Sequence, residues 1–551
     1  MIKRMIKKEL DGVLAKWARE KGLSGVPQYS LEEPPKKIGG DLSTNAAMLL
    51  GKQLKVNPKA AAQELSGLIA DSLKDVCEKV DIAGAGFINL TFSKRFLSGE
   101  LSNILSQNES YGRSEDGGSE KMLFEFVSAN PTGPLHIGHG RGAAIGDSLC
   151  RIFKHLGYDI TREYYLNDVG NQMEMLVRSL KLRYEEVSGE KIEFPEDGYK
   201  GEYIKDIARK LLENKTPKDQ IDFKKAALES MMATIASDLK GFGVAFDNWF
   251  SESVIALEKD ASGRTKVDLA CEYLLQEGLA EEKDGALWFL SMKYGDDKDR
   301  VLRRSDGRFT YLASDVAYHK NKLERGFTKL VDLWGADHHG YVPRMKAAMR
   351  ALGKDPDSLV IILYQLVSLV RNGAPVAMST RAGEFVTLEE VIREVGVDAC
   401  RFFFMLRAPD SQLEFDLELA KKQSSENPVF YVQYVHARCC SIFKEYNSKN
   451  EGGAPAEPDL SLLNTPEERD LIKKLAFFPD TLELCAKNFT PHHLTGYLME
   501  CADLFHRFYE NCRVIGDDKA LTGARLTLVK GVASIIKNGL NLLGVSAPER
   551  M

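Results

Sequence analysis

The feature that most constrains this chain is a strand, a Gly/Pro turn and a long helix that follow one another between residues 122 and 157. An apolar run begins at Met122 and leads into the turn Asn130-Pro131-Thr132-Gly133-Pro134. Apolar residues then recur at helical spacing as far as Gly157, a residue type common at helix C-termini. Because nucleotide-binding α/β units begin with this order of elements, we predict a doubly wound, Rossmann-like parallel sheet.

Two histidines mark the start of the predicted helix. His136 and His139 are three residues apart, with Ile137 and Gly138 between them. At this spacing both rings share one helix face, and near a helix N-terminus they can donate hydrogen bonds to a polyphosphate. Gly138 leaves room for an adenine ring. Either histidine alone is better explained as a structural residue, but together in a strand-to-helix turn they predict a catalytic ATP site.

A second segment carries residues suited to phosphate binding. The run Ala377-Met378-Ser379-Thr380-Arg381-Ala382-Gly383 combines small hydroxyls with a cation. By itself this run is better explained as a surface turn. Because it follows the apolar strands of the α/β core, in the same chain as the two histidines, we consider it a candidate second part of the ATP site.

The two motifs resemble the His-Ile-Gly-His and Lys-Met-Ser-Lys-Ser signatures of class I aminoacyl-tRNA synthetases, and the whole chain resembles bacterial arginyl-tRNA synthetases. The resemblance implies ATP with Mg²⁺ as a substrate. It gives catalytic roles to His136, Gly138, His139, Ser379 and Arg381. It implies ATP contacts from His136, Ile137, Gly138 and His139 in the first motif and from Met378, Ser379, Thr380 and Arg381 in the second.

The second signature departs from the family pattern at both of its lysines. Ala377 stands in place of the first lysine and Thr380 in place of the second. Some arginyl enzymes that lack the first lysine carry one just before the His-x-Gly-His signature, but Gly133 occupies that place here. The candidate replacements for the missing cation are Lys121, Arg371 and Arg381.

The side chains expected to select arginine include a carboxylate on a predicted helix. The segment from Phe309 to His319 places Tyr311 and Asp315 on one helical face, and a guanidinium requires a carboxylate that accepts two parallel hydrogen bonds. Without the other motifs, these two would be an ordinary aromatic residue and a solvated carboxylate. The resemblance implies arginine contacts by Glu125, Ser128, Asn130, His139, Tyr311, Asp315 and His338. If Asp315 is not the guanidinium partner, Glu125 and Asp337 are the next candidates.

The chain is too long for one core, so we expect several domains. We predict an α+β domain at residues 1–112, a catalytic domain at 113–425 with a helical insertion at about 175–300, and an all-α bundle at 426–551. The resemblance makes the first, with its motif from Gly40 to Asn45, an additional tRNA-binding domain and the last an anticodon-binding domain. It implies tRNA contacts by Asn427, Tyr431, Tyr434, Tyr509 and Met551. Exposed aromatic rings can stack on unpaired bases, although a place in the helix core explains any one tyrosine equally well.

Composition narrows the partners and the location. The net charge is −6, so tRNA would have to bind a local basic face. The nine cysteines contain no Cys-x-x-Cys pair, so we expect reduced thiols and no protein-bound zinc or other metal. No apolar run is long enough to span a bilayer, and the first residues lack the apolar core of a signal peptide. We expect a cytoplasmic monomer without membrane contact. The family resemblance implies tRNA(Arg), L-arginine and ATP as its partners.

Two alternatives remain open on sequence alone. A class I ligase for cysteine or glutamate would share the nucleotide motifs, but it would need zinc-ligand spacing or a cationic pocket in place of Asp315. A relative that binds tRNA without catalysis is suggested only by Ala377. The sequence favours an arginine–tRNA ligase, which forms arginyl-adenylate and transfers the arginyl group to the 3' end of tRNA. The resemblance further implies that arginine activation requires bound tRNA.

Overall fold

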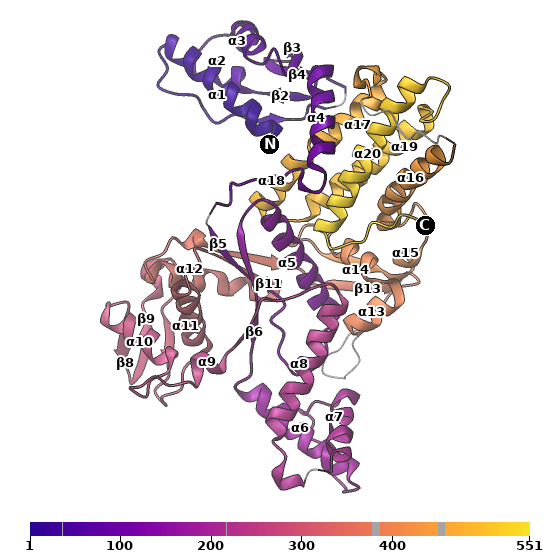
Figure 1. The fold of residues 1–551 in the computed structure, drawn as a ribbon. Coiled ribbons are helices and arrows are strands. Elements are labelled where there is room, and N and C mark those ends of the chain that lie inside the picture. The colour runs from indigo at the N-terminus through magenta and orange to yellow at the C-terminus, as the bar shows by residue number, and fades with distance from the viewer. Residues whose placement is uncertain (36, 119, 216, 377–385, 450–457) are drawn as a thin grey trace.

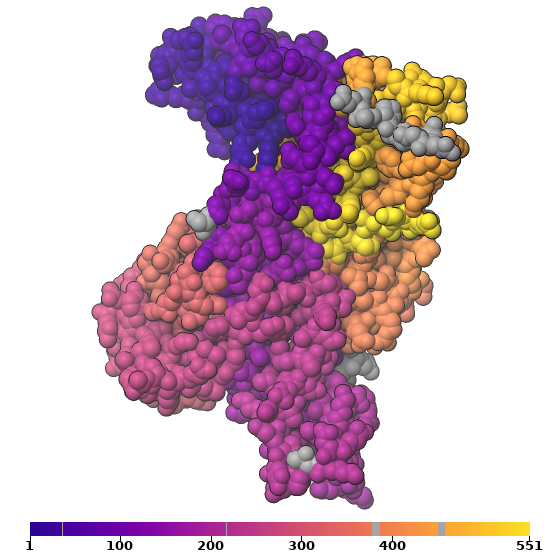
Figure 2. Space-filling view, in the orientation of Figure 1, coloured from indigo at the N-terminus to yellow at the C-terminus, as the bar shows by residue number. Residues whose placement is uncertain are grey.

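The computed structural model describes residues 1–551 apart from 36, 119, 216, 377–385 and 450–457. The described chain forms an elongated molecule with the N-terminal unit at one end and a helical projection at the other (Figure 1). The space-filling view shows the N-terminal residues meeting the C-terminal helices near the top of the molecule (Figure 2). The predicted class, an α/β catalytic region with α+β and all-α flanking parts, is confirmed.

A five-stranded parallel sheet lies at the centre. Its strands, in spatial order, are β12 (Leu359–Tyr364), β11 (Lys329–Gly335), β5 (Lys121–Glu125), β6 (Asp159–Leu166) and β7 (Asn248–Ser251). The chain builds outward from β5 to β6 and β7, and then returns to the other side of β5 with β11 and β12. The order therefore reverses between β5 and β11, and ligands of such sheets bind at the carboxyl ends of the strands beside this point.

Helix α5 (Ile137–His155) follows β5 and lies close against the sheet. A Cβ atom on Gly142 would be 2.9 Å from the Tyr364 ring, and one on Gly146 would be 2.4 Å from the Phe126 ring. The helix ends before Gly157, whose φ of +84° favours glycine. The strand, turn and helix predicted from the sequence are thus confirmed, and glycines let the helix approach the sheet closely.

The segment at about 175–300, predicted to be a helical insertion, is helical in its first part. Helices α6 (Asn171–Val187), α7 (Glu202–Glu213) and α8 (Phe223–Gly241) surround a small separate core. After them the prediction is wrong, because β7 returns to the central sheet. The elements that follow are α9 (Ser253–Ala256), α10 (Lys266–Gln276) and the antiparallel strands β8 (Ala280–Lys283), β9 (Ala286–Phe289) and β10 (Arg300–Arg303).

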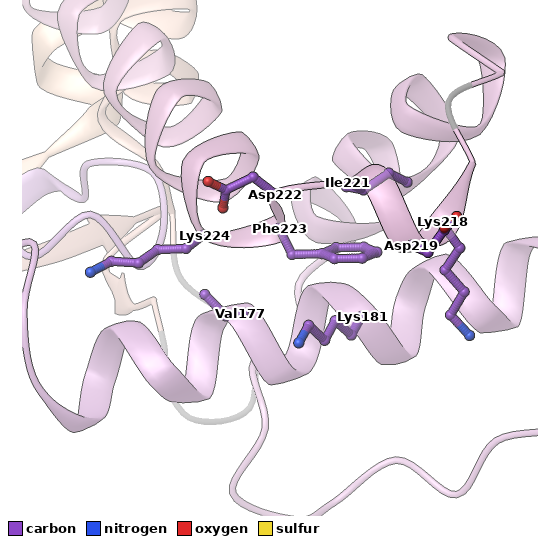
Figure 3. Close-up of a pocket in the computed structure, with 8 residues that line it drawn as sticks. All are labelled: Val177, Lys181, Lys218, Asp219, Ile221, Asp222, Phe223 and Lys224. Atoms are coloured by element: carbon purple, nitrogen blue, oxygen red, sulfur yellow. The ribbon is translucent and has the colours of Figure 1, made fainter.

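The helical projection carries an open groove of about 710 Å³ between α6 and the start of α8. Figure 3 shows Val177 and Lys181 on α6 facing the segment that carries Phe223 and Lys224. The Lys181 ammonium lies 5.8 Å from the centre of the Phe223 ring. None of the residues that line this groove belongs to a predicted catalytic motif, so the groove is not the predicted ATP site.

The rest of the catalytic region contributes helices on both sides of the sheet and a second small sheet. Helices α11 (Tyr311–Glu324) and α12 (Val342–Ala351) flank β11 in the chain. Further along are β13 (Val367–Arg371), β14 (Ala374–Pro375), α13 (Leu388–Val395), α14 (Val397–Phe404), β15 (Leu413–Asp416) and α15 (Leu417–Lys421). The Arg141 side chain of α5 donates to the carbonyls of Gln365 and Ser411, at 2.7 and 2.9 Å, and so fixes α5 to this second part.

The N-terminal unit is α+β. It contains α1 (Ile2–Glu20), β1 (Leu31–Glu32), β2 (Leu42–Thr44), α2 (Ala46–Leu54), α3 (Pro58–Ser72), β3 (Cys77–Ala83) and β4 (Phe87–Phe92), with an antiparallel sheet in the order β1-β2-β4-β3. Asp41, from the motif predicted to contact tRNA, accepts hydrogen bonds from the Phe92 amide and from Arg469 of the C-terminal bundle, both at 2.7 Å. In this structure Asp41 is therefore part of the joint between the two units.

The C-terminal part is a helical bundle. Its helices are α16 (Pro428–Lys449), α17 (Pro466–Ala476), α18 (Phe478–Asn488), α19 (His492–Asn511) and α20 (Lys519–Leu542). Helix α4 (Lys94–Gln107) packs against α17 and α20, although it precedes them by most of the chain. Buried Arg401 donates to Asp147 of α5 at 2.6 Å and to the Leu543 carbonyl at 2.8 Å, which joins the bundle to the catalytic helix. No helix among the described residues is long and apolar enough to cross a bilayer.

Candidate active site

The candidate site begins with an unusual turn at the carboxyl end of β5. Val127 and Ser128 have φ values of +67° and +39°, and the Ser128 amide donates to the Phe126 carbonyl at 2.9 Å. A three-residue turn with positive φ at a β-branched residue is strained, and such strain of roughly 1–3 kcal/mol is concentrated at functional sites. Ser128 Oγ donates to Glu125 at 3.1 Å and accepts from the Tyr165 amide at 3.1 Å. These contacts hold the turn in place.

The two signature histidines cap helix α5. His136 Nδ1 accepts a hydrogen bond from the Gly138 amide at 3.1 Å, and His139 Nδ1 faces the His136 amide at 3.3 Å. Their rings stack with centroids 3.7 Å apart. A Cβ atom on Gly138 would be only 3.0 Å from the His136 ring, so a larger residue would push that ring out of place. The predicted sharing of one face is confirmed.

The protonation of the histidines suits them to donate hydrogen bonds. Burial lowers the pKa of His136, and burial together with His136 lowers the pKa of His139 to about 3. Both rings are therefore neutral at pH 7. Because each Nδ1 accepts from a backbone amide, the remaining proton lies on Nε2. Two Nε2–H donors at the positive end of a helix form an anion site without adding a full charge.

Carboxylates gather at the same edge of the sheet. Asp315, in the first turns of α11, accepts a hydrogen bond from Tyr341 at the end of the short 3₁₀ helix Ala336–Tyr341. Burial raises the pKa of Asp315, and the Tyr341 bond opposes that shift. Tyr341 was not predicted from the sequence. Its hydroxyl fixes the orientation of Asp315 before any ligand binds.

Glu252 is a second carboxylate that the sequence analysis missed. It follows β7 and is 6% exposed. Burial and the nearby charges of Asp315 and Asp168 raise its pKa to about 7, and Tyr165 hydrogen-bonds to it. Among the described residues, no Lys, Arg or His side-chain nitrogen lies within 4.0 Å of the carboxylate oxygens of Glu252 or Asp315. The site therefore holds two carboxyl groups that form no ion pair with a described side chain, although the more distant charges of His319 and Lys322 lower the pKa of Asp315.

The remaining residues predicted to bind arginine differ in burial: some are buried at the site and others are exposed. Glu125 is buried and contacts Lys322, 2.6 Å away, as well as Ser128. Tyr311 begins α11 as predicted but is 78% exposed. The side chain of His338 is 63% exposed and faces the exposed Asp337 at 3.6 Å. Asn130 is exposed in the turn after β5. Glu125 and Ser128 contact each other, and the charges of Glu125 and Asp315 both raise the pKa of Tyr165. Tyr311 and His338 lie at the surface.

The candidate replacements for the missing lysine can be compared by position. Lys121 begins β5, so it lies at the amino edge of the sheet, roughly 13 Å from the carboxyl edge at 3.3 Å per residue. That placement contradicts a phosphate role for Lys121. Arg371 ion-pairs with Glu394 at 2.7 Å. Ala377, Met378, Ser379, Thr380 and Arg381 lie outside the described residues, but Thr387, just after them, forms an antiparallel bridge with His136.

Three of the predicted tRNA-contact residues come together on the bundle. Tyr431 and Tyr434 stack on His506 with ring centroids 4.8 and 6.0 Å away, and Arg438 lies over Tyr434 and Tyr509. By contrast, Asn427 is 3% exposed, and its amide donates to the Ala420 and Lys422 carbonyls. Met551 is 51% exposed at the end of the chain. Asn427 therefore caps α16 in this structure and presents no free amide to a partner.

No group of three or more His, Cys, Asp or Glu side chains that could hold a metal ion occurs in the part of the chain that the structure describes. All nine cysteines are unpaired, and eight of them are buried.

Comparison with known proteins decides between the related ligases. Three family models match in sequence: the arginyl-tRNA synthetase N-terminal domain at residues 1–92, the class I (R) tRNA synthetase catalytic domain at 100–405, and the DALR anticodon-binding domain at 432–551. The arginine–tRNA ligase of Syntrophotalea carbinolica is 49% identical over 537 residues, which cover 96% of this chain and 95% of that protein. The chain belongs to the arginyl-tRNA synthetase family. The arginine–tRNA ligase of Geobacter sp. strain M21 is 49% identical over 559 residues, which cover 100% of this chain and 99% of that protein.

Solved structures agree on the fold of this arginyl-tRNA synthetase family member. The Thermus thermophilus arginyl-tRNA synthetase matches with a TM-score of 0.77 and 22% identity, over 100% of each chain. The Plasmodium falciparum arginyl-tRNA synthetase matches with a TM-score of 0.75 and 18% identity, over 100% of this chain and 99% of the other. The family and the arginine–tRNA ligase function predicted from the sequence are confirmed, and the cysteine, glutamate and non-catalytic alternatives are set aside.

Proposed function

We propose that the carboxyl edge of the central sheet performs arginine–tRNA ligation in two steps. In the first, an oxygen of the arginine carboxylate attacks the α-phosphorus of MgATP, the bond to the β-phosphate breaks, and pyrophosphate leaves. In the second, the terminal ribose hydroxyl of tRNA(Arg) attacks the arginyl carbonyl, loses its proton and releases AMP. Both steps need positioning and charge stabilisation and use no protein nucleophile.

The observation that supports this proposal best is that histidine hydrogen-bond donors and carboxyl groups both lie at the carboxyl edge of the central sheet. The Nε2–H donors of His136 and His139 suit the phosphates, and the unneutralised carboxyl groups of Asp315 and Glu252 suit a guanidinium. Thr387, which follows the second signature in the chain, forms a bridge with His136. We therefore propose that Ser379 and Arg381, with Met378 and Thr380, complete the ATP site.

Further roles follow from the same arrangement. We assign the arginine backbone to the turn at Ser128 and Asn130 and to His139, and we add Glu252 to the guanidinium site beside Asp315. Tyr311 and His338, which are exposed in this structure, would contact arginine only if they closed over the site. We assign unpaired tRNA bases to Tyr431, Tyr434 and Tyr509. We further propose a monomer in the cytoplasm, where nine unpaired cysteines would stay reduced.

The decisive experiment is ATP–pyrophosphate exchange with arginine and tRNA(Arg) present, followed by transfer of labelled arginine to tRNA. We expect exchange only with arginine among the twenty amino acids. We also expect that omitting tRNA abolishes exchange, because the family resemblance implies a site completed by tRNA. Robust exchange without tRNA would contradict that dependence and leave the ligase activity intact, whereas exchange with another amino acid would contradict the ligase assignment.

Glu252 predicts a pH dependence of arginine binding. A guanidinium binds the carboxylate form, and the Glu252 pKa is about 7 before arginine binds, so affinity rises as pH rises through 7. Between pH 6 and pH 8 the ionised fraction, and with it the association constant for arginine, should increase about tenfold. Equilibrium dialysis with labelled arginine measures this slope, in the presence of tRNA if binding requires it. Glu252→Gln should flatten the slope, while Glu258→Gln, which changes an exposed carboxylate nearby, should keep it.

A further inference from the structure

Lys322 is a fully buried cation that none of the steps above uses. It lies on α11, two turns after Asp315, and its side chain is 0% exposed. Its ammonium lies 2.6 Å from Glu125 Oε2, 2.9 Å from Asp332 Oδ1, and 4.3 Å from the centre of the Tyr318 ring. Lysine is almost never fully buried unless it is paired, so these carboxylates account for its presence. Breaking such a pair is costly, because a buried charge would be left without a partner.

The side chains around Lys322 pair with one another in a network of hydrogen bonds and ion pairs. His319 Nε2 lies 2.9 Å from Asp332 Oδ2, and His319 Nδ1 lies 2.8 Å from the Asp315 carbonyl. On the neighbouring strand β6, Glu163 is paired with Arg325 at 2.5 and 2.8 Å and accepts from Tyr318 at 2.6 Å. The carboxylates of Glu125, Asp332 and Glu163 thus each have a cationic or hydrogen-bonding partner from the chain. Within the part of the chain that the structure describes, the carboxylates of Asp315 and Glu252 form no ion pair with a Lys, Arg or His side chain.

The connection from Lys322 to the site passes through Glu125. One oxygen of this carboxylate contacts Lys322, and the other accepts the hydroxyl of Ser128 at 3.1 Å. Ser128 Oγ in turn accepts from the amide of Tyr165, which fixes the strained turn against β6. A carboxylate held on both oxygens has little freedom to rotate. The position of the Ser128 turn therefore depends on a cation on α11, the same helix that carries Asp315.

We propose that Lys322 is a positioning residue that fixes the reacting end of bound arginine, by holding Glu125 against the Ser128 turn while Asp315 on the same helix receives the side chain. This inference rests on the proposed arginine site. Because Lys322 and Asp315 share one helix, they set the distance between the two ends of the substrate. Loss of Lys322 should leave the guanidinium contact intact and displace the carboxylate that attacks ATP.

The test is a kinetic comparison of Lys322→Met and Lys322→Gln with wild type in tRNA arginylation. We expect kcat to fall by on the order of 100-fold, as for a misplacement of about 1 Å, while the KM for arginine changes by less than about threefold. A merely structural role would instead raise the KM for arginine and lower the melting temperature with kcat preserved, and that result would overturn the proposal. Lys320→Met is the matched control and should keep wild-type kcat, because Lys320, two residues away, pairs with Glu324 and lies over the Tyr273 ring.

A double-mutant cycle with Glu125→Gln tests the route. If Lys322 acts through Glu125, Lys322→Met combined with Glu125→Gln should be no slower than the slower single variant. If the fold decreases in kcat of the two single variants multiply in the double variant, Lys322 does not act through Glu125. Should Lys322→Met not fold, the cycle is run with Lys322→Gln, and Lys322→Arg, which keeps the charge, must then be faster than Lys322→Gln. An absence of arginine-dependent activity in wild type would instead defeat the proposed function itself, together with this inference.

Discussion

Replacing Asp315 with asparagine is expected to raise the KM for arginine steeply, with a loss of about 3–5 kcal/mol in kcat/KM. Asparagine keeps the shape of the side chain but removes the charge that faces the guanidinium. Among the described side chains, none forms an ion pair with the Asp315 carboxylate, so that carboxylate is available to the substrate. Lysine, a point charge, cannot make the two parallel hydrogen bonds of a guanidinium, so the variant should also lose preference for arginine over lysine.

The effect of Asp315→Asn is to be compared with the loss of two tyrosine hydroxyls, those of Tyr341 and Tyr311. Tyr341→Phe removes the hydrogen bond that orients the carboxylate, and Tyr311→Phe removes a hydroxyl that would reach the site only on closure. Each should cost roughly 1.5–3 kcal/mol if its hydroxyl bonds a charged group. Steady-state arginylation kinetics give the order of the three effects. If Asp315→Asn is milder than Tyr311→Phe, or if Asp337→Asn is the more severe carboxylate change, the guanidinium partner is not Asp315.

Replacing either signature histidine with alanine is expected to slow arginine activation by about 10² to 10³, the loss typical of one charge-stabilising donor. Burial and the neighbouring His136 lower the pKa of His139 to about 3, so the effect of His139→Ala should be nearly constant from pH 6 to pH 8. Pyrophosphate exchange at saturating ATP and arginine, with tRNA(Arg) present, measures the rate.

The control for the histidines lies in the same helix. His155→Ala removes a histidine near the other end of α5, where the ring contacts the Tyr111 carbonyl at 3.0 Å, and should leave the rate unchanged. His136→Ala also removes an N-terminal cap, which should cost about 0.5–2 kcal/mol of stability. Thermal unfolding separates that loss from the kinetic one. Full exchange activity in folded His136→Ala or His139→Ala would exclude a phosphate role for that residue.

Local patterns in the sequence were enough to predict the first strand-turn-helix unit. Met122 and the apolar residues up to Gly157 follow the repeat of a buried strand and then of a helix, and the spacing of His136 and His139 sets their shared face. The region after residue 241 was predicted wrongly because β7 contains only Asn248–Ser251, too short and too polar to stand out. Its place at the edge of the sheet depends on pairing with β6, a contact between distant segments.

The sequence analysis missed some site residues for the same reason: their places depend on contacts between distant segments. Glu252 looks like a loop carboxylate between two serines, and only the strand order places it near Asp315. The turn at Val127 could not be predicted, since a valine with positive φ contradicts the preference of β-branched residues. Lys322 did leave a signal. Asp315, His319 and Lys322 follow one another at intervals of four and three residues, so they lie on one face of the helix. The buried residues of this helix are otherwise mostly apolar, which makes these polar residues stand out.

Helix α4 has a consequence for how the chain is made. Its apolar face, with Leu97, Leu101 and Ile104, is buried, and its partners lie in helices synthesised much later. Asn108, directly after it, accepts a hydrogen bond from Asn538, 430 residues further along. At typical translation rates of about 5–20 residues per second, that face would wait roughly 20 to 90 s for its partners on the ribosome. Nascent chains stopped short of α20 should therefore bind chaperones or aggregate through residues 94–107, while released full-length protein should not.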